Sequence, residues 1–265
     1  MNIRKAFFAH YKDSVALYPN TNIVGLFCQG SQNYRLATEN SDLDTKLIIT
    51  PTFKELAMNK KPVSTTHVRD NNEHIDAKDI RLYIQTFRKQ NLNFLEILYT
   101  PYFIINPTYA NEWNRLIRAR EEITHMNPFR TVRSLKGMIM EKYHSMERPT
   151  PARMELIEKY GYDPKNLCNI LRVKEVIEKY LAGESYKNCL IPQDCEYLIA
   201  VKNGIYDLEH AREVANNALL QATEMAQNFL NSHSDEEKTE VVELLEDIQY
   251  KIMRISVERE LRNEK

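Results

Sequence analysis

Residues 22–50 read NIVGLFCQGSQNYRLATENSDLDTKLIIT, and this stretch decides the fold that the sequence predicts. An apolar run ends at Gly30-Ser31, ten residues follow, and Asp42-Leu43-Asp44 then opens a second apolar run. The two apolar runs predict buried strands over 23–28 and 42–49, joined by a polar turn or short helix. The polar residues at the ends of these strands are the candidate functional residues.

Asp42 and Asp44 are one residue apart in a segment that we expect to be extended. Successive side chains of a strand point to opposite faces, so both carboxylates project together while Leu43 faces the other way. Two carboxylates on one face attract hard divalent cations, and Mg²⁺ usually takes one or two carboxylates plus the phosphates of its substrate. The alternative is a turn that opens a strand, with both acids solvated or paired to Lys46 or Arg35.

Gly30 and Ser31 suggest the complementary half of such a site. A glycine lets the backbone approach a ligand closely, and a neighbouring serine hydroxyl can hydrogen-bond a phosphate oxygen. Phosphate binding beside a metal is what phosphoryl or nucleotidyl transfer requires, and two-metal sites hold ions about 3.5 to 4 Å apart.

This arrangement resembles the DNA polymerase beta superfamily of nucleotidyltransferases. Their pattern is a hydrophobic strand, Gly-Ser, a spacer of similar length, and Asp-hydrophobic-Asp on the next strand. The resemblance implies an α+β fold, with a small mixed β-sheet catalytic domain like the polymerase beta palm over 1–110 and a helical domain over 111–265.

The resemblance also implies roles for single residues. Two Mg²⁺ or Mn²⁺ ions would be held by Asp42, Asp44 and a third carboxylate. The β and γ phosphates of a nucleoside triphosphate would be bound by Gly30 and Ser31. Lys46 lies two residues beyond Asp44 on the same face of the strand, so it is a candidate contact to phosphate or acceptor.

The third carboxylate is expected on a neighbouring strand, and the short extended piece 73–76 offers two acids. Asp76 is the first candidate and Glu73 the second, because one residue of register decides which acid faces the metals. A helical pattern begins near Ala77, so Asp76 is equally well placed as the N-cap of that helix. The two roles do not exclude one another.

A narrower resemblance links the chain to a family of bacterial and phage nucleotidyltransferases that includes proteins proposed to act in RNA repair. The resemblance covers about residues 22–230 and rests on three motifs. The first consists of Asn93, Leu95, Glu96 and Leu98. The second is Gly161-Tyr162-Asp163-Pro164-Lys165 with Asn169 and Leu171-Arg172, and the third is Val201-Lys202-Asn203-Gly204. Three positions depart from the family pattern: Arg35, Thr45 and Asn169. None removes a metal ligand, so they affect the substrate more than the chemistry.

The second of these motifs opens a predicted helix, with Asp163 as N-cap and Pro164 at the first helical position. Lys165, Asn169 and Arg172 follow at spacings of four and three, so they share one helix face. Such a row suits contact with a triphosphate or acceptor, because Lys and Arg neutralise the charge of phosphoryl transfer. A surface row paired to acids is the alternative.

Amphipathic spacing predicts further helices, over 2–17, 128–147, 207–230 and 235–263. The last helix carries an apolar stripe that packs on its own domain or supports a homodimer. The segment 52–72 is apolar-poor and Lys-rich, and we interpret it as a surface excursion.

Composition limits the remaining options. The 265-residue chain has a net charge of −1, which gives no global attraction to nucleic acid. Its four cysteines form no Cys-x-x-Cys pair, and its N-terminus lacks the pattern of a signal peptide. No apolar run has the roughly 18 residues needed to span a membrane. We therefore expect a cytoplasmic protein with reduced thiols.

The sequence predicts a metal-dependent nucleotidyltransferase that moves a nucleoside monophosphate from a nucleoside triphosphate to an acceptor and releases pyrophosphate. Family association favours an RNA end as acceptor. The alternative keeps the fold without catalysis, as a nucleotide-sensing or RNA-binding regulator. No Gly-rich Walker loop or Gly-x-Gly-x-x-Gly stretch supports a P-loop or dinucleotide enzyme.

Overall fold

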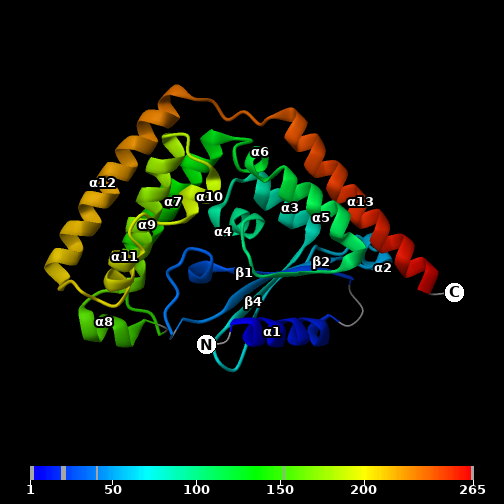
Figure 1. The fold of residues 1–265 in the computed structure, drawn as a ribbon, viewed down its shortest axis with the longest axis horizontal. Coiled ribbons are helices and arrows are strands. Elements are labelled where there is room, and N and C mark those ends of the chain that lie inside the picture. The colour runs from blue at the N-terminus through cyan, green and yellow to red at the C-terminus, as the bar shows by residue number, and fades with distance from the viewer. Residues whose placement is uncertain (1–2, 19–21, 40, 152, 264–265) are drawn as a thin grey trace. The chain divides into compact units, whose positions relative to one another are not determined.

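The computed structural model describes residues 3–18, 22–39, 41–151 and 153–263 (Figure 1). It combines a five-stranded mixed sheet with many helices, which confirms the α+β class. In the described ranges no helix is both long and apolar enough to cross a bilayer.

The chain forms two compact units. The sheet unit contains Met1–Asn33, Glu39–Asn127 and Glu237–Lys265, and the helical unit contains Tyr34–Thr38 and Pro128–Glu236. The expected division between 110 and 111 does not coincide with these units, because residues 111–127 and the C-terminal segment pack with the sheet.

The sheet has the strand order β3-β4-β2-β1-β5. Its strands are β1 (Asn22–Gln29), β2 (Asp44–Thr50), β3 (Ser64–Val68), β4 (His74–Asp79) and β5 (Phe103–Ile105). β2 and β4 are parallel, and the other neighbouring pairs are antiparallel. The sheet is therefore mixed, as the family resemblance implies.

Two register positions determine which polar side chains lie beside β2 on one face of the sheet. Gln29, the last residue of β1, pairs with Asp44, the first residue of β2, so the Gly30-Ser31 turn begins beside Asp44. On the other side of β2, Lys46 pairs with Asp76 of β4. Paired residues on neighbouring strands project to the same face of a sheet. Asp44, Lys46 and Asp76 therefore share one face.

The opposite face of the sheet packs against α1 (Ile3–Leu17), as Figure 1 shows. The core there is formed by Phe7, Leu26, Leu43, Leu47, Ile75 and other apolar side chains. The expected helix over 2–17 is thus confirmed from residue 3 onward, and Asn2 lies outside the described residues. Leu43 points into this core, as the alternation of side chains predicts.

The face that carries Asp44 is covered by helices of the sheet unit. These are α3 (Ile80–Arg88), α4 (Leu92–Leu95), α5 (Ala110–Arg118), α6 (Arg120–Thr124) and α13 (Thr239–Asn263), with three 3₁₀ turns at Gly30–Gln32, Glu96–Leu98 and Pro107–Tyr109. Phe27 packs on Trp113 of α5, and the Thr50 and Ser256 hydroxyls are 2.7 Å apart. The apolar stripe of α13 is buried within its own unit, through Val241, Leu245, Ile248 and Ile252.

The helical unit is built on α9 (Pro164–Leu181), which contacts α7 (Pro128–Ser145), α10 (Tyr186–Leu190), α11 (Cys195–Lys202) and α12 (Leu208–Ser232). α8 (Met154–Tyr160) is the remaining helix of the unit. Asp163 caps α9 by accepting hydrogen bonds from the backbone N–H groups of Lys165 and Asn166, as predicted. Five alanines of α12 are buried, which lets this helix approach its neighbours closely.

Two local predictions need correction. The strand β4 continues to Asp79 and α3 begins at Ile80, so the helix starts three residues later than expected and its N-cap is Asp79. The segment 52–72 contains α2 (Phe53–Ala57) and the edge strand β3. Most residues of β3 are exposed, so the strand lacks the apolar alternation that would have predicted it.

Candidate functional site

Asp44 and Asp76 project from neighbouring parallel strands onto one face of the sheet. The Asp76 side chain is 21% exposed and that of Asp44 is 36% exposed. Asp42 is exposed and precedes β2, so it belongs to the loop and not to the strand. Asp44 and Asp76 thus lie on the same face of the sheet, whereas Asp42 lies in the exposed loop before β2.

Asp76 is paired with the lysine that faces it across the two strands. The Nζ of Lys46 lies 3.0 Å from Asp76 Oδ2 and 4.1 Å from the centre of the Phe94 ring, and the lysine side chain is only 4% exposed. Burial lowers the pKa of Lys46, while the Asp76 carboxylate opposes this shift. Lys78 also lies over Phe94, at 4.9 Å, so two ammonium groups contact one aromatic ring.

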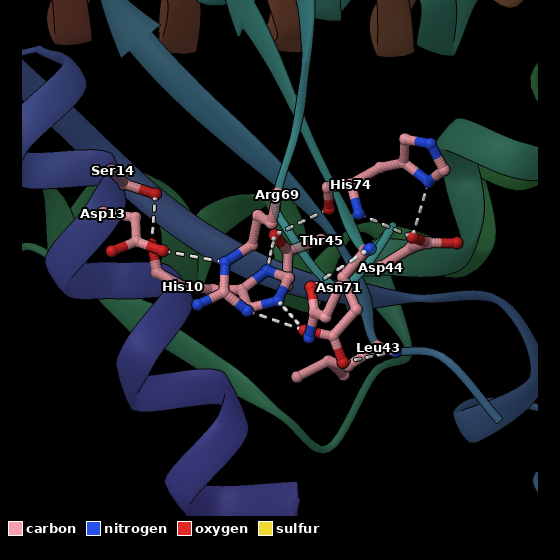
Figure 2. Close-up of polar contacts among 10 residues, drawn as sticks. His10, Asp13, Ser14, Leu43, Asp44, Thr45, Arg69, Asn71 and His74 are labelled. Carbon is pink, nitrogen blue, oxygen red and sulfur yellow. Dashed lines mark hydrogen bonds and ion pairs between the residues drawn. The ribbon is translucent and has the colours of Figure 1, made fainter. Parts of the chain in front are cut away.

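Asp44 is held by the first residue of β4. Its Oδ1 accepts a hydrogen bond from the backbone N–H of His74 at 2.9 Å and lies 3.0 Å from the His74 ring Nδ1 (Figure 2). Within the described ranges no hydrogen bond reaches Asp44 Oδ2. This oxygen is therefore available to a substrate group.

The Gly30-Ser31 turn follows β1 directly. Gly30 has a φ of +80°, a conformation that favours glycine, and among the described atoms nothing lies within 4 Å of the place a Cβ would take. The glycine is thus required by backbone conformation. Its N–H donates to Glu96 Oε1 at 3.0 Å. A carboxylate oxygen occupies the position at which the sequence predicts a phosphate oxygen.

Behind the sheet, a buried polar network supports the Asp42–Asp44 segment (Figure 2). His10 of α1 contacts Thr45 Oγ1 through Nδ1 and Glu73 Oε2 through Nε2, both at 2.9 Å. The other oxygen of Glu73 accepts the backbone N–H of Leu43 at 3.2 Å, and Arg69 donates to Oε2 at 2.6 Å.

The two candidates for the third acid, Glu73 and Asp76, have different surroundings. Glu73 is buried on the α1 side, fully engaged in the network, whereas Asp76 lies on the side of Asp44 and Lys46. Asp76 is also not the helix cap, since Asp79 accepts the N–H of Arg81 in that role. The choice of Asp76 as the first candidate is consistent with this geometry.

The surroundings of Asp76 include one buried hydroxyl. The Tyr83 hydroxyl has no hydrogen-bond partner among the described residues, and burial together with the Asp76 charge raises its pKa well above the ordinary value. Tyr83 packs edge-on against Phe94, the ring beneath Lys46. On β1, burial raises the pKa of Cys28 to about 12, with Glu96 and Asp44 adding to the shift, so this thiol is not a nucleophile near neutral pH.

The side chains present do not fit a two-ion site held by three carboxylates. In the described part of the chain, no three His, Cys, Asp or Glu side chains converge as a group that could hold a metal ion. Asp76 carries the Lys46 ammonium instead. The metal roles of Asp42, Asp44 and Asp76 stay predictions.

The predicted phosphate contacts of the helical half all lie on α9, in the helical unit. Lys165 is exposed, and Asn169 is partly buried. Arg172 is buried at 4% exposure, and its guanidinium lies 4.0 Å from the centre of the Tyr34 ring. Arg172 thus contributes to the packing of its own unit. The nucleotide roles of Lys165, Asn169 and Arg172 stay predictions.

Sequence reasoning missed the side chains that support the site. The roles of Phe94 and Glu96 were not foreseen, although both lie in the segment that carries the family motif with Asn93 and Leu95. His10 gave no signal, because a lone histidine on a helix face has no distinctive spacing.

The chain matches no protein-family model, and no curated protein matches it either. It is similar to a solved structure, the crystal structure of a nucleotidyltransferase-like protein from Exiguobacterium sibiricum 255-15. The two share 11% sequence identity, with a TM-score of 0.30 over 86% of this chain and 75% of that one.

Proposed function

We propose that this protein is a nucleotidyltransferase that transfers a nucleoside monophosphate from a nucleoside triphosphate to an acceptor. The observation that carries the proposal is the register of the sheet. The pairing of β1 with β2 brings the Gly30-Ser31 turn beside Asp44. The pairing of β2 with β4 brings Lys46 beside Asp76, on the face of the sheet that also carries Asp44. These are the elements of the resemblance described above, brought together by strand pairing.

The chain supplies three functions in this proposal. The Ser31 hydroxyl and the turn around it bind the β and γ phosphates, and the Lys46 ammonium partly neutralises the triphosphate. Asp44 Oδ2 accepts the proton of an acceptor hydroxyl. The acceptor oxygen then forms a bond to the α phosphorus, the bond from that phosphorus to the bridging oxygen breaks, and pyrophosphate leaves. An RNA end is the acceptor class that we propose.

Label transfer tests this function directly. Each of the four α-labelled nucleoside triphosphates is incubated with RNA, protein or small acceptors, with Mg²⁺ or Mn²⁺ present. We expect one nucleotide to label an acceptor, and Asp44→Asn to reduce labelling by about 100-fold or more, because the proton acceptor is lost. Asp70→Asn is the matched control, since Asp70 is exposed on the turn after β3. Undiminished labelling by Asp44→Asn contradicts the assignment.

A second function has two observations in its favour. The Lys46 ammonium occupies Asp76, and the Glu96 carboxylate occupies the Gly30 N–H, so the site is already satisfied without substrate. A nucleotide-sensing regulator on the same fold needs no turnover. It is indicated if a nucleoside triphosphate raises the melting temperature of the parent, and not that of Lys46→Met, while no acceptor is labelled.

A further inference from the structure

The Lys46–Asp76 ion pair is fixed by the fold. The two residues are direct register partners on the parallel strands β2 and β4, so their side chains leave the sheet side by side. The distance of 3.0 Å between Nζ and Oδ2 is that of a charge-assisted hydrogen bond. Strand pairing would have to change before these two side chains ceased to be neighbours.

The surroundings of Lys46 also leave its ammonium little freedom. The side chain is 4% exposed, and its Nζ lies 4.1 Å from the centre of the Phe94 ring. Phe94 is itself fixed by an edge-on contact with the buried Tyr83. Lys78 lies on the other flank of the pair, at 4.9 Å from the same ring, where its Nζ donates to Ser64. The Phe94 ring therefore holds the Lys46 ammonium next to Asp76.

The Lys46 ammonium disfavours a divalent cation at Asp76. Mg²⁺ binds carboxylate oxygens at about 2.0 to 2.1 Å, so it would lie within a few ångströms of the ammonium that now contacts the same carboxylate. The two positive charges would repel strongly in a site screened from water. The Lys46 ammonium therefore competes with a divalent cation for Asp76.

We propose that the Lys46 ammonium is the permanent counter-ion of Asp76 and takes the place of one divalent cation, so that the site binds at most one such ion together with a nucleoside triphosphate. This inference rests on the proposed function, because it concerns the cations of the same site. It differs from the two-ion arrangement that the family resemblance implies. The single positive charge is supplied by the chain and needs no ion from solution.

Counting bound Mn²⁺ tests the inference. Equilibrium dialysis of the full chain against Mn²⁺, with and without saturating α,β-methylene ATP, gives the number of ions per chain, and the electron paramagnetic resonance signal reports free ion. We expect the parent to bind at most one Mn²⁺ in either condition. Lys46→Met frees the Asp76 carboxylate, so this variant should gain one ion. The double variant Lys46→Met with Asp76→Asn should lose that gain.

Two further variants provide matched controls. Lys78→Met removes the other ammonium over Phe94 without touching the Asp76 pair, so it should gain no ion. Lys46→Arg keeps a positive charge opposite Asp76, so it should also gain none. A parent that binds two Mn²⁺ overturns the inference, and so does a Lys46→Met variant that gains nothing or a Lys78→Met variant that gains as much. The number of Mn²⁺ ions that the parent binds still tests the inference if Lys46→Met does not fold.

Failure of the proposed function is distinguishable from failure of this inference. Binding of labelled α,β-methylene ATP is measured in the same dialysis cells. If the analogue does not bind, ATP is not the nucleotide of this site, and label transfer with the four triphosphates decides the proposed function. The comparison of the parent with Lys46→Met in Mn²⁺ alone still decides whether Lys46 excludes an ion from Asp76.

Discussion

His10 and Glu73 form a buried acid-base pair directly behind the segment that carries Asp42 and Asp44. Because an ionised carboxylate only accepts hydrogen bonds, His10 donates through Nε2 to Glu73. The Thr45 hydroxyl lies 2.9 Å from His10 Nδ1 and 3.4 Å from the His74 carbonyl oxygen. Burial lowers the pKa of His10, although Glu73 opposes the shift. Burial alone would raise the pKa of Glu73, but hydrogen bonds from His10, Asn71 and Leu43 outweigh it and hold that pKa below its usual value.

These shifts make the free energy of unfolding depend on pH in one direction. His10 binds its proton less readily in the folded than in the unfolded state, so stability falls as pH drops below the ordinary value of 6.5. Glu73 adds a second loss of stability below its ordinary pKa of 4.5, since its pKa in the folded state is also lowered. Acid should therefore loosen the support of the Asp42–Asp44 segment.

Urea unfolding at about pH 7.5 and about pH 5.5 measures the histidine contribution. We expect the parent to lose stability between these values and His10→Gln to lose clearly less, because glutamine does not titrate. His144→Gln is the control, since His144 is exposed on α7. Equal losses in the parent and in His10→Gln would show that other groups cause the acid sensitivity.

At the scale of elements, the residue that caps α3 is Asp79 and not Asp76, which the sequence analysis considered for that role. Asp79 is 1% exposed, accepts the N–H of Arg81 and forms an ion pair with its guanidinium. Asp79→Ala should lower the free energy of unfolding by about 1 to 2 kcal/mol and speed amide exchange in the first turn of α3. Asp79→Asn keeps a capping oxygen, so it should lose less stability than Asp79→Ala. If Asp76→Ala frays that turn as much as Asp79→Ala does, the assignment of the cap is wrong.

The helix start was predicted three residues early for a physical reason. Both Asp76 and Asp79 precede apolar residues at helical spacing, and either is an acceptable N-cap. The deciding feature is that Ile75 and Ala77 are buried beneath α1, which requires the strand alternation to continue. This burial against a helix some 60 residues earlier in the chain is a tertiary effect, so it cannot be predicted from the local sequence around Asp76.

At the scale of the whole molecule, the sequence predicted the neighbouring strands β1 and β2, and the family resemblance implied the mixed sheet, but neither predicted the division of the helices. Polar residues at strand ends and an uninterrupted apolar run are local signals, so β1 and β2 were found. The stripe on α13 predicts only that this helix packs on something. Its partners, β2, α3 and α5, precede it by more than 100 residues, so the C-terminal helix was assigned to the wrong unit.

The division into units has a consequence for stability that one pair of variants tests. Ile248 of α13 and Ile170 of α9 are both fully buried, but the first lies in the sheet unit and the second in the helical unit. Each change to alanine should cost about 2 to 5 kcal/mol, because it removes apolar contacts and leaves a cavity. If each unit is stabilised mainly by its own core, the cost should appear within that unit.

Native-state hydrogen exchange reads the two cores separately. Ile248→Ala should lower the protection of the β2 amides and leave those of α9 close to the parent, although β2 and α13 are nearly 200 residues apart in the chain. Ile170→Ala should give the reverse pattern. Equal losses in β2 and α9 from either variant would mean that both units unfold together. In the expected case, acid or mutation acting on His10 and Glu73 would open the sheet that holds Asp44 while α9 keeps its structure.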